Sequence, residues 1–224
     1  METSLHRQLK QHYATGTARQ EVVADEFRID VVRGDEFVEI QHGSLAAIRD
    51  KIKRLVRDHQ VLVVKPIVLR KRLIKLDEKN GRIVYRRMSP RTGSLLELFD
   101  ELIYFTRVFP HPNLTLEVPL VEIEEWRYPG HGRRRRRRRD DHQVADQKLL
   151  GIHGLHRFET ATDLLTLLPT DLPQPFHTAD LAASMNIRRW NAQRIAYCLR
   201  KMGAVDEAGK QRNARLYKIT KRAA

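Results

Sequence analysis

Apolar residues recur with a helical period in two segments near the start of the chain. In residues 2–13 one helical face carries Leu5, Leu9 and either His12 or Tyr13, and Gly16 then ends the helix. In residues 44–59 a stripe with the same period follows Ser44, a good N-cap, through Leu45, Ile48, Ile52, Leu55 and Val56. Segments 20–23, 27–32 and 37–41 look like strands, and 61–68 is a continuous apolar run typical of a strand buried on both faces. The predicted order is helix, three strands, helix, strand.

The middle of the chain is predicted to add more sheet and one helix. Residues 69–77 and 82–88 flank Asn80-Gly81, a strong hairpin signal. Residues 94–105 form an amphipathic helix with Ser94 as its N-cap. Residues 114–126 alternate like a strand, in which Pro119 indicates an edge or a bulge. The seven arginines at 133–139 are predicted to lie in a loop near 130–140.

The pattern changes after residue 152, where we place a domain boundary. A short helix at 178–185, a turn at Asn186 and a longer helix at 188–202 are followed by two short strands within 204–219. Helix, turn, helix and hairpin is the layout of a winged helix-turn-helix. We therefore predict two domains, 1–152 and 153–224, and an α/β (α+β) fold overall.

Charge indicates the kind of partner. Lys and Arg number 42 against 28 acids, which gives a formal net charge of +14 and a pI near 10.3. This excess favours a polyanionic partner, with DNA as the leading candidate and RNA left open. A homodimer is also left open. The single cysteine, Cys198, excludes an intramolecular disulfide framework. Because the sequence shows no apolar run of membrane-spanning length and no signal-peptide core, we expect a cytoplasmic protein without a membrane partner.

Two acids in the hairpin at 27–41 call for an explanation. If Gly34 and Asp35 form a two-residue turn, the paired positions put Val31 opposite Val38 and Asp30 opposite Glu39. Opposed β-carbons lie about 4.5–5.5 Å apart, so two like charges there are unfavourable unless a positive group lies between them. Either a divalent cation is held by both carboxylates, or the face is a solvated polar one with Arg28 neutralising the acids. A bulge at Gly34 would change this pairing.

The acids of this hairpin resemble the motif of a known nuclease superfamily. Asp30, followed after eight residues by Glu39-Ile40-Gln41 within this order of elements, resembles the PD-(D/E)xK superfamily of restriction-endonuclease-like nucleases over residues 2–67. The resemblance implies that Asp30 and Glu39 bind a catalytic Mg²⁺ or Mn²⁺ and that Gln41 occupies the lysine position. Ile29 stands where the motif has proline. Glutamine carries no charge and cannot act as a base, although some restriction enzymes of the superfamily use it there.

Four further residues are candidates for this site. Glu21 is either an additional acidic ligand or an exposed charge on a strand. Lys51 either supplies the missing cation from the following helix or is a surface lysine. Ser44 begins a helix whose N–H groups could face a phosphate, and Arg28 could contact phosphate directly.

The C-terminal half resembles winged-helix DNA-binding domains over residues 155–219, a fold that also serves protein contacts. One face of the helix at 188–202 is predicted to read DNA through Arg189, Trp190, Gln193 and Arg194. Lys210, Arg212 and Arg215 lie where a wing would touch the phosphate backbone. The motif order also resembles that of uncharacterised bacterial proteins with an RID…EIQ hairpin, an HPN segment, a basic loop and a winged helix.

The sequence therefore predicts a restriction-endonuclease-like core with a β-rich extension, joined to a winged helix. The expected function is metal-dependent hydrolysis of DNA phosphodiester bonds. The alternative is a catalytically inactive DNA-binding or regulatory protein that keeps the nuclease-like fold.

Overall fold

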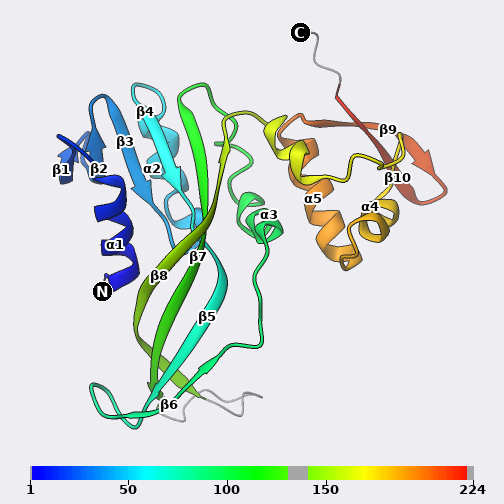
Figure 1. Ribbon diagram of the computed structural model, residues 1–224. Coiled ribbons are helices and arrows are strands. Elements are labelled where there is room, and N and C mark those ends of the chain that lie inside the picture. The colour runs from blue at the N-terminus through cyan, green and yellow to red at the C-terminus, as the bar shows by residue number, and fades with distance from the viewer. Residues whose placement is uncertain (1, 131–140, 221–224) are drawn as a thin grey trace. The chain divides into compact units, whose positions relative to one another are not determined.

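A computed structural model of the protein describes residues 2–130 and 141–220 (Figure 1). The arginine run at 133–139 and its predicted loop fall largely outside this part of the chain. The chain divides into two compact units. The first unit comprises Met1–His42, Val63–Leu95 and Glu117–His156, and the second comprises Gly43–Leu62, Leu96–Leu116 and Arg157–Ala224. The fold is a mixed α/β fold with one large mixed sheet and one small antiparallel sheet.

The first unit begins with the predicted helix and three strands: α1 (Ser4–Tyr13), β1 (Arg19–Ala24), β2 (Phe27–Arg33) and β3 (Glu36–Ile40). The predicted hairpin register is confirmed, because Val31 pairs with Val38 and Arg33 with Glu36. Gly34 takes the left-handed conformation (φ 58°) that a tight hairpin turn needs and that glycine adopts without a steric penalty. The alternating apolar residues Ile29, Val31, Val38 and Ile40 are buried, which fixes this register.

The two predicted middle helices begin later than their patterns suggested. Ser44 caps a 3₁₀ turn, η1 (Leu45–Ala47), and α2 spans only Arg49–Leu55. In the same way a 3₁₀ turn, η2 (Leu95–Glu97), precedes α3 (Leu98–Leu102). Hydrophobic periodicity marks the buried face but does not distinguish a 3₁₀ turn from the first turn of an α-helix. The Leu45 amide donates a hydrogen bond to the Glu101 carboxylate at 2.9 Å. This bond satisfies one of the N–H groups that have no partner within the first turn of a helix.

The apolar segment 61–68 forms two strands rather than one, β4 (Gln60–Val64) and β5 (Ile67–Leu76), because Lys65-Pro66 interrupts it. Both strands run parallel to β7 (Leu114–Pro129): the Lys65 amide donates to the Glu117 carbonyl, and Ile67 pairs with Leu120. The expectation that Pro119 marks a sheet edge is wrong, since β7 lies in the interior of the sheet between other strands. Pro119 lies beside the interruption at Lys65-Pro66, where a missing donor costs least.

The large sheet has the strand order β1-β2-β3-β4-β7-β5-β6, and β8 (His142–Phe158) pairs with β7. The predicted hairpin around Asn80-Gly81 is formed by β5 and β6 (Ile83–Met88), and β6 is the last strand of that order. β8 continues beyond residue 152, the predicted domain boundary, to Phe158.

The predicted C-terminal elements are all present. After η3 (Asp163–Leu167) come α4 (Thr178–Ser184), α5 (Arg189–Lys201) and an antiparallel pair, β9 (Val205–Gln211) and β10 (Ala214–Ile219). Cys198 is buried, and burial raises the pKa of its thiol to about 12, so it is a core residue rather than a nucleophile. Across the described ranges 2–130 and 141–220, no helix has the length and apolar character needed to cross a membrane.

Candidate functional site

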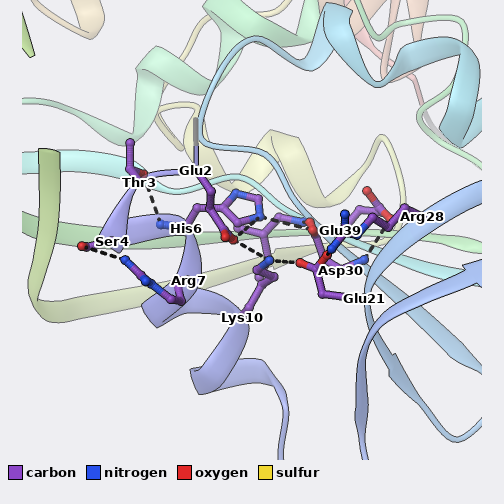
Figure 2. Close-up of polar contacts among 11 residues, drawn as sticks. Glu2, Thr3, Ser4, His6, Arg7, Lys10, Glu21, Arg28, Asp30 and Glu39 are labelled. Atoms are coloured by element: carbon purple, nitrogen blue, oxygen red, sulfur yellow. Dashed lines mark hydrogen bonds and ion pairs between the residues drawn. The ribbon is translucent and has the colours of Figure 1, made fainter. Parts of the chain in front are cut away.

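Three acids occupy successive positions across the first three strands. Pairing of β1 with β2 puts Glu21 level with Asp30, between the pairs Gln20–Val31 and Val22–Ile29. The register of β2 with β3 puts Asp30 level with Glu39. We call Glu21, Asp30 and Glu39 the carboxylate row (Figure 2). Glu21 has φ 57°, which is uncommon for a residue with a side chain, and it interrupts the ladder at this point.

The side chains of Asp30 and Glu39 converge as the hairpin register predicts. Asp30 Oδ2 accepts the main-chain amide of Ile40 at 2.9 Å, and the Asp30 amide points to Glu39 Oε1 at 3.4 Å. Each carboxylate therefore contacts the backbone of the other strand. Glu39 is 4% exposed and the Asp30 side chain 19% exposed, so both are largely removed from water.

Helix α1 brings a stripe of charged and polar side chains to this row. His6 and Lys10 lie one turn apart on the same side of α1, and Glu2, just before the helix, contacts both of them. His6 Nε2 lies 3.2 Å from Asp30 Oδ1, and Lys10 forms ion pairs with both Glu2 and Glu21. Sequence reasoning missed these residues, although the polar 2-6-10 spacing beside the buried Leu5, Leu9 and Tyr13 was a usable signal.

Electrostatics keeps this cluster ionised. Burial alone would raise the pKa of Asp30, but hydrogen bonds from His6 and the Ile40 amide outweigh it and the pKa is lowered. The hydrogen bond from Lys10 lowers the pKa of Glu21. Burial acts to lower the pKa of Lys10, yet its bonds to Glu2 and Glu21 leave it raised. All three groups are therefore charged at neutral pH.

The cluster has more negative than positive charge of its own. Glu2, Glu21, Asp30 and Glu39 supply four carboxylates, against the two permanent cations Lys10 and Arg28, which pairs with Glu21. These six charged residues sum to −2. Within residues 2–130 and 141–220 no group of three or more His, Cys, Asp or Glu side chains is arranged to hold a metal ion. Mg²⁺ is usually held by only one or two carboxylates together with water and phosphate oxygens, so Asp30 and Glu39 fit that ligand set.

Gln41, the residue in the lysine position, follows directly on β3. Its main-chain amide donates to the Val64 carbonyl at 2.8 Å, and its side chain is half-buried. The next residue, His42, accepts a hydrogen bond at its carbonyl from the buried Lys65 at 3.0 Å. Burial, followed by the charges of Lys65 and Lys71, lowers the pKa of His42 to about 4, so its imidazole is neutral at pH 7.

The other two residues proposed for this site belong to the second unit. Ser44 caps η1, and Lys51 lies within α2. The helix that was expected to start at Ser44 and aim its amides at a phosphate is instead a 3₁₀ turn followed by the seven-residue α2.

A second polar network lies on β5, β7 and β8 of the first unit. Glu125 is 3% exposed and accepts hydrogen bonds from Lys71 (2.6 Å), Gln147 (2.8 Å) and Arg127. Burial would raise the pKa of Glu125, but these donors lower it. The network is linked to α1, because Asp146, next to Gln147, accepts the Ser4 amide at 2.8 Å. Nothing in the sequence pattern pointed to this network, since its members come from three distant strands.

In the second unit, α5 exposes part of the surface expected to contact DNA. Arg189, Trp190 and Gln193 are exposed, whereas Arg194 forms an ion pair with Asp100 and lies 4.7 Å from the Trp190 ring. Arg194 is thus engaged within its own unit. The predicted wing residues Lys210, Arg212 and Arg215 are exposed.

A groove of about 560 Å³ joins the start of α5 to the β9–β10 turn, lined by His177, Arg189, Gln211, Arg212, Asn213 and Ala214. The structure thus brings together Arg189 and Arg212 from the proposed DNA-binding set. Two guanidinium groups on one groove suit an anionic ligand such as a phosphate.

Comparison with known proteins places the chain in a family. Residues 3–159 match the model of a "Domain of unknown function (DUF8091)", and the chain belongs to that family. The match ends just past β8 and does not include the C-terminal helices. A Treponema pallidum (strain Nichols) protein named "Uncharacterized protein" is 31% identical over 182 residues, which cover 81% of this chain and 71% of the relative. No solved structure matches.

Proposed function

We propose that the protein is a metal-dependent nuclease that hydrolyses DNA phosphodiester bonds at the carboxylate row. The placement of Asp30 and Glu39, whose carboxylates each contact the backbone of the other strand of the β2–β3 hairpin, carries this proposal. It is the arrangement that the resemblance to restriction-endonuclease-like nucleases requires. The α1-β1-β2-β3 order and the hairpin register are compatible with such a core.

Asp30 and Glu39 are the residues that would hold Mg²⁺ or Mn²⁺, with Glu21 next in the row. A metal ion bound there would polarise the phosphate and lower the pKa of an attacking water. Lys10 holds Glu21 in place and supplies the cation that Gln41 cannot, from the helix before the hairpin rather than from Lys51. Arg28, which pairs with Glu21 and whose side chain is 72% exposed, would contact a phosphate oxygen.

The groove at Arg189 and Arg212 supports DNA binding by the second unit. Its exposed guanidinium groups would hold phosphates, while Gln193 on α5 would contact base edges. RNA is the alternative nucleic acid, because the phosphate contacts are common to both.

One observation favours a second function, nucleic-acid binding without hydrolysis. Asp30 already accepts a hydrogen bond from the Ile40 amide and contacts His6, and Lys10 already neutralises Glu21. An acid row satisfied by the protein's own groups can be a structural feature, and Gln41 leaves the motif without its lysine.

Cleavage assays separate the two functions. Labelled duplex, single-stranded DNA and RNA would be incubated with Mg²⁺ or Mn²⁺ and wild type, Asp30→Asn, Glu39→Gln or the control Asp35→Asn. Asp35 is an exposed carboxylate in the turn of the same hairpin, so it matches the charge change outside the row. If the protein is a nuclease, wild type and Asp35→Asn cleave in a metal-dependent manner. The cleavage rates of Asp30→Asn and Glu39→Gln are then lower by about a hundredfold or more. Binding without cleavage in all four proteins would favour the second function.

A further inference from the structure

The hairpin of β5 and β6 concentrates positive charge on the first unit. Residues 67–93 contain nine Lys and Arg and two acids, a net charge of +7, which is half of the chain's formal +14. β6 is fully exposed along its length and includes Val84 (56% exposed), Tyr85 (40%) and Met88 (46%). Basic side chains interleaved with an exposed aromatic ring are the composition of a surface that binds unpaired bases.

One face of this hairpin is built around Tyr85. Lys75 pairs with Tyr85 across the strands and places its Nζ 5.6 Å from the ring centroid, and the Arg87 Cζ lies 6.0 Å from it. On the parallel side Lys75 pairs with Arg127 of β7. A hollow of about 90 Å³ opens here, and Tyr85, Arg87, Arg127, Tyr128 and His142 are among its lining residues. Among the lining residues that the structure describes, the cations Lys75, Arg87 and Arg127 outnumber the acid Asp141, and Arg127 is paired with Glu125.

The face that carries Tyr85 also carries the polar network and α1. Tyr13 of α1 donates to Glu117 of β7, and side chains alternate along a strand, so Glu125 and Arg127 point to the same side as Glu117. Lys71 contacts Glu125 on this face, and α1, which carries Tyr13, also carries His6. Cationic and polar groups therefore extend along one face of the sheet from Tyr85 to His6, which contacts Asp30.

We propose that single-stranded nucleic acid binds along this face, with a base stacked on Tyr85 and phosphates held by Lys75 and Arg87. Stacking on an exposed ring requires an unpaired base, which a duplex does not offer. If the carboxylate row is a nuclease site, single-stranded nucleic acid is its substrate, and that part of the proposal rests on the proposed nuclease function. The claim that this surface binds single strands does not depend on the nuclease function.

The test is fluorescence anisotropy of labelled oligo-dT, oligo-U and a duplex, each about 20 units long, bound by the full chain in EDTA. Tyr85→Ala is expected to weaken single-strand binding about five- to one-hundredfold and to leave the duplex Kd within about twofold. Tyr85→Phe keeps the ring and is expected to bind within about twofold of wild type. The tighter of oligo-dT and oligo-U identifies the sugar that the surface prefers.

Arg86 provides a matched control for Arg87. Arg86 pairs with Ile74 on the opposite face of β6 and is also exposed, so Arg86→Gln removes the same charge from the neighbouring position. Arg87→Gln is expected to weaken single-strand binding at least threefold more than Arg86→Gln does. Equal losses from both variants, or a Tyr85→Ala protein that binds single strands as wild type does, would overturn the proposal.

Failure of this surface is distinguishable from failure of the nuclease. Binding is measured without metal, and Asp30→Asn is expected to bind single strands as wild type does. If substitutions at Tyr85 and Arg87 weaken binding but no protein cleaves, only the nuclease proposal is contradicted. If cleavage depends on Asp30 while Tyr85→Ala binds normally, only the single-strand surface is lost.

Discussion

The main-chain amide of Asp30 lies 3.4 Å from Oε1 of Glu39, and the Asp30 carboxylate accepts the amide of the residue after Glu39 at 2.9 Å. Each of these two acids thus directs its carboxylate at the backbone of the neighbouring strand. Bringing two largely buried carboxylates together is unfavourable unless cations or N–H groups offset the repulsion. Here α1 supplies part of that compensation through His6 and Lys10.

Lys10→Met tests the compensation by α1. The Lys10 side chain is 5% exposed, but its partners Glu2 and Glu21 are 44% and 31% exposed. We therefore expect the free energy of unfolding of Lys10→Met in EDTA to be about 1–3 kcal/mol lower than that of wild type. Added Mn²⁺ should restore part of this loss by taking the place of the ammonium group. Urea titrations with and without Mn²⁺ give both quantities. The exposed Lys53→Met is the control, and a Lys10→Met protein as stable as this control would show that the ammonium group is not needed.

His42 predicts a pH dependence of stability. Its pKa falls from 6.5 in the unfolded chain to about 4 in the fold, so the unfolded state binds more protons between these values. Stability should therefore fall as the pH is lowered through this window, with about 2 kcal/mol lost between pH 7 and pH 5. Asp30 and Glu21 have lowered pKa values, so their contributions are lost mainly as the pH falls below their ordinary values of 3.8 and 4.5, and they do not mask the effect between pH 7 and pH 5. Urea unfolding of wild type and His42→Gln at both pH values measures it, and an equal loss in the two proteins would refute the assignment.

Arg189 and Arg194 should behave differently in duplex DNA binding. Arg189 is exposed on the groove, so Arg189→Gln is expected to weaken duplex binding several-fold and to reduce the slope of log K against log salt by about 0.9. Arg194 is paired with Asp100, so Arg194→Gln should change binding by less than about twofold and lower stability by up to about 1 kcal/mol. Anisotropy titrations at several salt concentrations separate the two. A larger loss for Arg194 than for Arg189 would mean that another surface contacts DNA.

Local patterns predicted part of this structure well. The apolar alternation of Ile29, Val31, Val38 and Ile40 around Gly34 fixed the hairpin register, because a slip by one residue would expose all four. The C-terminal helix, turn, helix and hairpin followed from periodicity and turn residues in the same way. These features depend on neighbours close in sequence.

The features that sequence analysis missed depend on distant partners. Lys10 and His6 matter only because α1 packs against β2 and β3, which no local pattern specifies. Glu125, Lys71 and Gln147 meet only once β5, β7 and β8 are aligned, and the long strand β8 has a mostly polar sequence that gives little strand signal. Pro119 was predicted to mark an edge or a bulge, because the matching interruption at Pro66 lies on another strand.

Direct measurement of Mn²⁺ binding tests the central claim most simply, because it requires no substrate. Electron paramagnetic resonance follows the loss of free Mn²⁺ signal as protein is added. The account predicts that wild type and Asp35→Asn bind Mn²⁺ and that Asp30→Asn and Glu39→Gln bind it at least about tenfold more weakly. Equal binding by all four proteins, or no binding by wild type at millimolar concentrations, would contradict it.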